Sequence, residues 1–470
     1  MTNWLPDLAA GTGPLYQRLA DTIESDIDKG VIGAGAKLPP QRDLAYDIGA
    51  TVGTVGRAYQ LLRERGLVSG EVGRGTYVLG HRADGVKPDA PDVGVEGTRH
   101  VDAPKGKLRF DSTAAPDTDQ GTIVADVLSR VAQDHPHEIS SYTRDFPQRW
   151  YEAGARWLSR NSFRPAADAI VPTLGTHAAV IAAIAALTTP GDYVAFEHLT
   201  YSQISRSAGL IGRRTALVAS DQEGIDPDDF ERVCAQKHPK MMFLMPAVQN
   251  PTLTILPAER RQAIARIARE YNVVLIEDDL YGGLTDEATP LLAEYAPERT
   301  IVAGGLSKSV AAGVRGGWLS CPPAYRHRIR VAHKMMTGGM PFLLAEVNAR
   351  LVLSGQASDI RKRSIAEIGA RIAIVRQTLA GFDFKSNDRV PFVWLTLPDP
   401  WLSGTFKNAC LEHGVLIDDE DEFKAGRSEQ VFHGVRFGVS QPRQRGDVAE
   451  GVAVIRRLLE EGRAGYDSFS

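Results

Sequence analysis

The sequence predicts an α/β protein made of two unequal parts, a short N-terminal unit and a much larger C-terminal unit. Three observations carry this prediction. Apolar residues at helical spacing and two short strands fill residues 13–79. A stretch rich in Gly, Pro and Asp and without periodicity runs from about His81 to Lys107. From about Leu108 onward, helical patterns alternate with short apolar strands, which is typical of a mostly parallel sheet covered by helices.

Length and composition narrow the possible classes of protein. A chain of 470 residues exceeds one ordinary domain and favours two or three. With 43% hydrophobic and 24% charged residues it has the composition of a soluble globular protein. The net charge of -4 argues against a generic polyanion binder, although a local basic face remains possible. Three scattered cysteines, and histidines that are dispersed apart from the single pair His135 and His137, favour neither a disulfide scaffold nor a metal site.

The first residues of the chain and its apolar stretches predict the cellular location of the protein. MTNWLPDLAAG lacks a basic region followed by an apolar run, so we expect no signal peptide. No stretch reaches the roughly 18 apolar residues that a membrane span needs. These patterns predict a cytoplasmic protein.

The N-terminal unit shows three helical patterns followed by two strands. Glycines end the first helix, the Pro39–Pro40 pair opens a second helix that runs through Ile48, and Thr51 can cap a third. The strands LVSGE and TYVLG follow, joined around residues 73–75. The apolar stripe of the first helix consists of Leu15, Leu19, Ile23 and Ile27. Three helices with a β-hairpin predict a winged helix-turn-helix.

This arrangement places polar and basic residues where DNA would be read. A helix in the major groove presents its first residues to base edges, and here these are Thr51, Gly53 and Thr54, with Arg57 one turn further on. Two other arginines, at the start of the second helix and at the wing tip, can reach phosphates or a minor groove. They are Arg42 and Arg74. The first helix is acidic, but basic residues outnumber acidic ones from Lys37 to Thr76, which favours double-stranded DNA.

The segment LPPQRDLAYDIGATVGTVGRAYQLLRERGLVSGEVGRGTYV resembles the winged helix of the GntR family, and the resemblance covers nearly all of residues 13–79. It implies that the unit binds operator DNA. The sequence departs from the family at one place, because Val52-Gly53 stands where the family often carries Arg-Asn. A winged helix used only for protein contacts is the alternative.

Three segments of the large unit contain side chains that can bind a cofactor, and each segment follows an apolar strand. In GGLSKSVAAGVRGGW, Lys308 offers an amine for a Schiff base with pyridoxal phosphate and Arg315 offers a cation for its phosphate. In VVLIEDDLYGGL, Asp278 can keep a pyridine nitrogen protonated, and Tyr281 can donate to the ring hydroxylate. In MPAVQNPT, Asn250 can bond to the ring oxygen from the other side. Taken singly, each segment is an ordinary surface charge, strand end or turn.

The order and spacing of these three segments resemble the fold type I aminotransferase family from about residue 108 to the end. The resemblance implies a large mostly parallel α/β part at about 145–322. It implies a small α+β part at about 323–470 that includes the 108–144 segment. Further cofactor positions implied by the resemblance are Gly175, Thr176, His177, Tyr201 and Ser307, with Tyr142 contributed across a dimer. Arg436, together with Asn250, would bind the carboxylate of an amino acid. Two departures are Gly305, where the family usually has Ser or Thr, and residues 146–150.

A winged helix ahead of an aminotransferase-like domain resembles the MocR type of GntR regulators, to which the GabR-like proteins belong. The resemblance assigns residues 1–80 to the winged helix, 81–107 to a linker and 108–470 to the aminotransferase-like domain. It implies a head-to-tail homodimer and a site that senses metabolites rather than processing them.

We therefore predict a pyridoxal-phosphate-dependent transcriptional regulator. It would bind operator DNA and sense an amine, an amino acid or the cofactor itself through aldimine chemistry at Lys308. Because Lys308, Asp278, Tyr281 and Arg436 are all present, a catalytically active aminotransferase with an appended DNA-binding module remains the alternative. A regulator that has lost the cofactor is disfavoured because Lys308, Asp278 and Asn250 are all retained.

Overall fold

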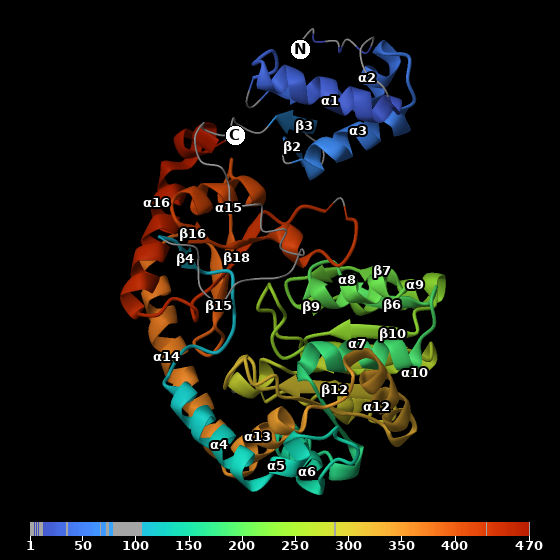
Figure 1. Cartoon of the computed structure of the whole chain (residues 1–470), viewed down its shortest axis with the longest axis vertical. Coiled ribbons are helices and arrows are strands. Elements are labelled where there is room, and N and C mark those ends of the chain that lie inside the picture. The colour runs from blue at the N-terminus through green and yellow to red at the C-terminus, as the bar shows by residue number, and fades with distance from the viewer. Residues whose placement is uncertain are drawn as a thin grey trace. The chain divides into compact units, whose positions relative to one another are not determined.

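The computed structural model describes Trp4, Pro6, Leu8 and residues 13–33, 36–65, 67–71, 75–78, 106–285, 288–428 and 430–469 (Figure 1). The chain forms two compact units, within residues 1–100 and 101–469. Nearly all of the predicted linker, and the wing-tip residue Arg74, lie outside the described residues. None of the helices in the described part of the chain has the length and apolar character that crossing a bilayer requires.

The N-terminal unit has the predicted three helices and β-hairpin. The helices are α1 (Leu15–Asp28), α2 (Gln41–Asp47) and α3 (Val52–Glu64), and the strands are β1 (Lys37–Leu38), β2 (Val68–Glu71) and β3 (Gly75–Val78). The antiparallel sheet has the order β1-β3-β2, so β1 adds a strand that was not predicted. Leu19, Ile23 and Ile27 of the predicted stripe are buried in the core of this unit. Tyr59 of α3 is also buried and donates its hydroxyl to the Pro39 carbonyl at 2.8 Å.

A seven-stranded sheet forms the centre of the larger unit. In spatial order its strands are β5 (Ile170–Thr173), β13 (Gly317–Ser320), β12 (Thr300–Gly305), β11 (Val274–Asp278), β10 (Met241–Leu244), β6 (Tyr193–Glu197) and β7 (Arg214–Val218). β13 runs antiparallel to both of its neighbours, and the remaining pairs are parallel. The predicted mostly parallel sheet is therefore confirmed.

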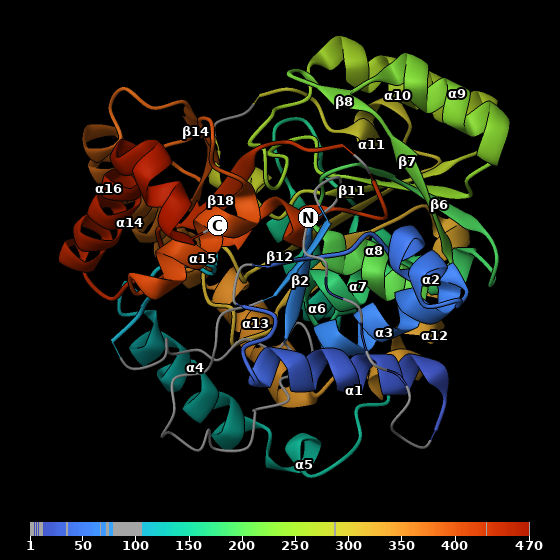
Figure 2. The ribbon, with the colours of Figure 1, turned by 90° about the horizontal axis from the view of Figure 1, so that it is seen from above.

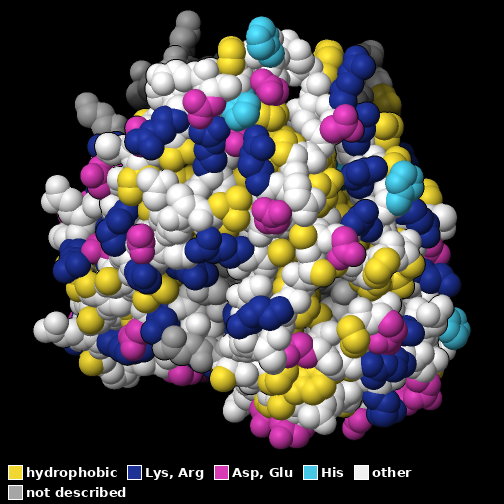
Figure 3. Space-filling model, turned by 90° about the horizontal axis from the view of Figure 1, so that it is seen from below, with side chains coloured by type: hydrophobic (Ala, Val, Ile, Leu, Met, Phe, Trp, Pro, Cys, Tyr) yellow, Lys and Arg dark blue, Asp and Glu magenta, His cyan; other side chains and the backbone are white. Residues whose placement is uncertain are grey.

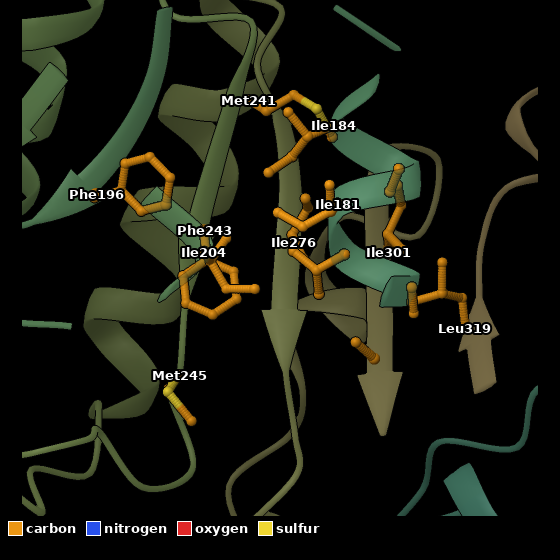
Figure 4. Close-up of a cluster of buried hydrophobic side chains, with 14 of the residues drawn as sticks. Ile181, Ile184, Phe196, Ile204, Met241, Phe243, Met245, Ile276, Ile301 and Leu319 are labelled. Carbon is orange, nitrogen blue, oxygen red and sulfur yellow. The ribbon is translucent and has the colours of Figure 1, made fainter. Parts of the chain in front are cut away.

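Helices cover both faces of this sheet. Helices α7 (Gly175–Leu187), α8 (Ser202–Leu210) and α12 (Pro323–Thr337) pack on one face, and α9 (Pro227–Lys237) and α10 (Ala258–Glu270) pack on the other (Figure 2). Successive residues of a buried strand point to opposite faces, so Phe243 joins the first cluster and Met242 the second. Figure 4 shows the first cluster, where Ile181 and Ile184 of α7 meet side chains of β6, β10, β11, β12 and β13.

A third layer of helices lies at the β5–β13 edge, where α4 (Gln120–Asp134), α6 (Gln148–Leu158) and α13 (Phe342–Leu353) share one apolar cluster with Trp318. Six shorter elements complete the large part. They are α5 (Pro136–Ile139), η1 (Ala167–Ala169), β8 (Ser220–Asp221), β9 (Gly224–Ile225), η2 (Gly282–Leu284) and α11 (Leu292–Tyr295).

The small part of this unit begins within the long helix α14 (Gln356–Thr378). Its antiparallel sheet has the order β14 (Phe384–Ser386), β15 (Phe392–Thr396), β18 (Gly434–Gly438) and β17 (Asp418–Asp419). The helices α15 (Ser403–Glu412), η3 (Glu420–Phe423) and α16 (Arg445–Phe469) complete it, with the parallel pair β4 (Leu108–Arg109) and β16 (Val415–Leu416).

The predicted boundary between the large and the small part, near residue 323, does not coincide with the division that the packing shows. Ile329 of α12 joins the cluster on the large sheet, and Phe342 of α13 packs with Val127 of α4 against the sheet edge. Only the beginning of the 108–144 segment, around Phe110, packs in the small part. Sequence patterns show that a helix has an apolar stripe, but they do not show which of two neighbouring cores buries it.

Candidate functional site

The predicted cofactor residues lie at the ends of neighbouring parallel strands. Asp278 ends β11, Asn250 follows β10, and Lys308 follows β12. Because these strands are parallel and adjacent, their carboxyl ends meet at one edge of the sheet, where ligands of open α/β sheets bind.

Lys308 is the first member of a series of side chains connected by hydrogen bonds. The Lys308 Nζ donates to Thr113 Oγ1 at 2.9 Å, and Thr113 Oγ1 lies 2.8 Å from the Tyr281 hydroxyl. The ammonium also lies 6.0 Å from the centre of the Tyr281 ring. Thr113 was not predicted, since a threonine in an irregular segment 195 positions before the lysine gives no sequence signal.

Aromatic contacts extend this series to the predicted effector residues. The Tyr281 ring packs edge-on against Phe392 at 5.3 Å, and the guanidinium of Arg436 lies 5.6 Å from the same phenylalanine ring. Arg436 Nη1 donates to Asn250 Oδ1 at 2.8 Å, and both side chains are buried. The structure therefore brings Lys308, Tyr281, Asn250 and Arg436 into one site.

The carboxyl group of Asp278 is fully enclosed. Its Oδ1 accepts the Leu280 N–H at 3.0 Å. Burial raises the pKa of Asp278 to about 7, and the neighbouring Asp279 acts in the same direction while Lys308 opposes it. A protonated pyridine nitrogen beside this carboxyl would stabilise its ionised form, so the residue suits the predicted role.

The titration of Asp278 leads to a pH-dependent prediction for the cofactor-free protein. The carboxyl has a pKa of 3.8 when unfolded and about 7 when folded, so the folded chain binds the extra proton between these values. Its contribution to the free energy of unfolding therefore falls as pH rises through this window. Asp278→Asn removes that contribution.

We expect the free energy of unfolding of Asp278→Asn, relative to wild type, to increase between about pH 5 and pH 7. Denaturant unfolding at the two pH values measures it. The buried carboxyls of Glu197 and Glu277, whose pKa values are also raised to about 7, are present in both proteins and cancel. A difference between the proteins that does not change with pH would contradict the assignment.

The first turn of α7 offers a cradle for a phosphate. Gly175 begins the helix at φ +77°, and the hydroxyl of Thr176 is buried with no hydrogen-bond partner among the described residues. The guanidinium of Arg315 comes within 3.7 Å of the point where a Cβ on Gly175 would lie. An unpaired hydroxyl, free helix N–H groups and a nearby cation fit the phosphate of the predicted cofactor.

The close packing around this cradle explains why Gly305 stands where the family usually has a serine or threonine. A Cβ at this position would lie 2.7 Å from both Thr176 Oγ1 and the Gly316 carbonyl oxygen. The backbone of β12 is therefore too close to α7 and β13 to accommodate the serine or threonine that the family usually carries.

The other predicted cofactor residues lie around this cradle. Tyr201 is half-buried and packs edge-on against the His177 ring at 6.1 Å. His177 Nε2 lies 3.2 Å from Ser207 Oγ, and burial together with Arg315 lowers the pKa of the imidazole, which favours its neutral form. The Ser307 carbonyl accepts the Ala115 N–H at 3.0 Å.

Tyr142 is not part of the site within a single chain. Its side chain is 93% exposed. The predicted role of this tyrosine is in a partner subunit, and it stays a prediction.

An acidic partner of Arg436 was also not predicted. Asp418 stands opposite Arg436 in the β17–β18 pairing, and its buried carboxylate accepts from Arg436 Nη2. The guanidinium also stacks over Phe423 at 4.5 Å, and its Nε has no hydrogen-bond partner among the described residues. Strand register alone brings the two charges together, so no local motif could have revealed the pair.

Five of the six predicted DNA-binding residues lie in the part of the N-terminal unit that the structure describes, at the start of α2 and on α3 with its cap. Thr51 caps α3 by accepting the Thr54 N–H at 3.2 Å, and the two hydroxyls lie 2.9 Å apart. Gly53, Arg57 and Arg42 are exposed. Elsewhere, on the face shown in Figure 3, Lys and Arg side chains are interspersed with Asp and Glu. The case for DNA rests on the winged helix, whose third helix carries most of these residues.

Comparison with known proteins agrees with both units. Residues 112–427 match the family of class I and II aminotransferases, and residues 15–78 match the gntR family of bacterial regulatory proteins. The uncharacterized HTH-type transcriptional regulator YdeF of Bacillus subtilis is 28% identical over 98% of this chain and 97% of its own length. The corresponding regulator YdcR of Escherichia coli is 28% identical over 89% and 93%.

Solved structures show the same fold in the large unit. The α-aminoadipate aminotransferase LysN of Thermus thermophilus, complexed with N-(5'-phosphopyridoxyl)-L-leucine, superposes with a TM-score of 0.67 at 22% identity. The alignment covers 78% of this chain and 94% of LysN. The cofactor that this family implies is pyridoxal 5'-phosphate, which the cradle, Asp278 and Lys308 fit. The chain belongs to the class I and II aminotransferase family and carries an N-terminal helix-turn-helix domain of the gntR family, the architecture of HTH-type transcriptional regulators.

Proposed function

We propose that this protein is a transcriptional regulator that binds operator DNA and senses an amine, an amino acid or pyridoxal 5'-phosphate itself through aldimine chemistry at Lys308. The observation that carries the proposal is the connected series from Lys308 through Thr113 and Tyr281 to Arg436 and Asn250. It supports the proposal because a primary amine and a buried guanidinium, the groups that an aldehyde and a carboxylate would bind, belong to one series of contacts in a chain that also has a helix-turn-helix domain of the gntR family.

Each residue has a role that follows from its chemistry. When bound, the cofactor supplies an aldehyde that bonds to a primary amine. Lys308 provides that amine, and the Thr113 hydroxyl accepts a hydrogen bond from it and orients it. Asp278 would hold the ring nitrogen, Tyr281 would donate toward the ring oxygen, and Arg436 would bind the carboxylate of an incoming amino acid.

The response to the effector would be a change of state rather than a product. An effector changes DNA affinity only by the difference between its affinities for the two states of the protein. Arg436 stands on the small part and Lys308 on the large part, so a ligand that touches both favours one arrangement of the two parts. The proposal includes a head-to-tail homodimer, in which paired winged helices read paired half-sites, and a cytoplasmic location, where the DNA is.

The DNA-binding role leads to a prediction for Arg57. We expect Arg57→Ala to weaken operator binding by about 1–3 kcal/mol and to lower the dependence of affinity on salt, because the exposed arginine would contact base or phosphate. Fluorescence anisotropy with DNA selected from a random pool by the full-length protein measures both. Arg63→Ala, an exposed arginine six positions further along the same helix, is the matched control and should bind normally. Equal affinities for wild type and Arg57→Ala would contradict the predicted reading face.

A working aminotransferase with an appended DNA-binding module is the second candidate. The observation that favours it is that Lys308, Asp278, Tyr281 and Arg436 are assembled in one place as catalysis requires. A turnover assay with amino donors and a keto acid distinguishes the two functions. A sensor binds amino acids with spectral change and releases no more than one equivalent of keto acid, whereas an enzyme releases keto acid continuously.

A further inference from the structure

A second cavity lies beside the cofactor residues but has different walls. Its volume is about 150 Å³, and its lining comes from the end of α6, the segment 279–285, the end of β12 and the start of α14. Lys308, Asp278 and Thr176 do not line it. It is therefore separate from the phosphate cradle, although Gly305 belongs to the walls of both.

The cavity contains an unpaired cation. The guanidinium of Arg361 is half-buried and stacks over the Trp157 ring at 4.8 Å. Its Nη1 lies 3.3 Å from the point where a Cβ on Gly283 would stand, and it makes no ion pair or hydrogen bond with any residue that the structure describes. Burial lowers the pKa of this arginine, which means that the surroundings stabilise its charge less than water does. A cation that has lost water without gaining a partner is costly unless an anion binds to it.

The other charges of the cavity compensate each other. Arg160 Nε donates to Asp279 Oδ2 at 3.0 Å, and Arg160 Nη2 lies 2.9 Å from Asp279 Oδ1. This is a two-pronged pair with no net charge. Asp279 is the only acidic residue among the described residues of the lining, so the excess positive charge comes from Arg361. Ser309 and Thr285 add hydroxyl groups to the same walls.

We propose that this cavity binds a small oxyanion, a phosphate or a carboxylate, through Arg361. The planar guanidinium presents two parallel N–H groups that match either oxyanion, and a volume of about 150 Å³ admits inorganic phosphate or a short carboxylate. The site goes beyond the proposed sensing function, because it needs neither the cofactor's aldehyde nor DNA.

The walls of this cavity are formed by segments that also position residues of the cofactor site. Trp157 donates its Nε1–H to the Gly305 carbonyl at 3.0 Å, three residues before Lys308. The segment 279–285 follows directly on Asp278 and contains Tyr281. Arg361 lies on α14, the helix that leads into the small part. A bound anion would thus hold together three segments that the cofactor site also depends on.

The test is calorimetric titration of the full-length, cofactor-loaded protein with inorganic phosphate and, separately, with succinate. With the cofactor bound, its own phosphate would occupy the cradle at α7. We expect saturable binding of at least one anion by wild type, and at least tenfold weaker binding by Arg361→Gln. Arg363→Gln, an exposed arginine on the same helix, should bind as wild type does. Preference for phosphate or succinate then identifies which source of oxyanion the site takes.

Arg361→Lys keeps the charge but loses the planar fork, and we expect it to bind with intermediate affinity, which covers the case in which the glutamine variant does not fold. Three results would overturn the proposal: no binding of either anion by wild type, equal binding by wild type and both Arg361 variants, or loss of binding in Arg315→Gln but not in Arg361→Gln. The last result would place the anion in the cofactor's cradle. None of these results depends on operator binding or amine sensing.

Discussion

Lys308→Ala is expected to remove the visible absorbance that pyridoxal 5'-phosphate gives when it is bonded to the protein. Lys308 is the amine that the hydrogen bond to Thr113 holds at the strand edge, beside Asp278 and Tyr281. The variant can still bind the cofactor's phosphate and ring, so cofactor would be lost on gel filtration more readily rather than excluded. Absorbance spectra before and after gel filtration measure both effects.

The control for this experiment is Lys362→Ala, since Lys362 is exposed on α14 and pairs only with Asp359 in the described part of the chain. It should keep the visible band. If Lys308→Ala retained the band at full intensity, another amine would hold the cofactor and the site would be wrongly assigned.

Arg436→Gln is expected to weaken binding of amino acids by about 100-fold, which corresponds to about 3 kcal/mol. The reason is that the buried guanidinium offers the charge-assisted bonds that a carboxylate needs. Amines without a carboxylate should bind nearly as before. Titration of the cofactor-loaded protein, followed by absorbance, gives both affinities.

Variants of Asp418 separate the effect of Arg436 on carboxylate binding from its effect on stability. Removing Arg436 alone leaves the Asp418 carboxylate buried without its cation, which is destabilising. Arg436→Gln combined with Asp418→Asn removes both charges, so we expect it to recover stability without recovering amino-acid binding. Asp418→Asn alone frees the arginine and should strengthen amino-acid binding. Equal weakening for amines and amino acids in Arg436→Gln would show that this arginine does not recognise the carboxylate.

The sequence was sufficient to predict the chemistry at the strand ends. Asp278, Asn250 and Lys308 each follow an apolar strand, and parallel strands bring their carboxyl ends to one edge regardless of how the rest of the chain packs. The winged helix was predictable for a similar reason, because helix caps and apolar stripes such as Thr51 and Ile23 are local signals.

Residues that depend on distant packing could not be predicted. Thr113 reaches Lys308 only because the segment after β4 passes over the strand edge, and Asp418 meets Arg436 only through the register of β17 and β18. The assignment of α12 and α13 to the large part depends on which core they bury. Arg361 looks like any helical arginine in the sequence, and only the folded chain shows that it faces Trp157 without a carboxylate among the described residues.

The central claim is that the cofactor site controls DNA binding, and one measurement tests it most directly. Anisotropy of labelled operator DNA is recorded with the cofactor-loaded protein while an amino acid that shifts its absorbance is added, for wild type and for Lys308→Ala. We predict that operator affinity changes with the same midpoint as the absorbance in wild type, and does not change in the variant. An operator affinity that stays constant in wild type while the absorbance shifts would contradict the account, and would leave an aminotransferase-like domain that binds amines without regulating DNA.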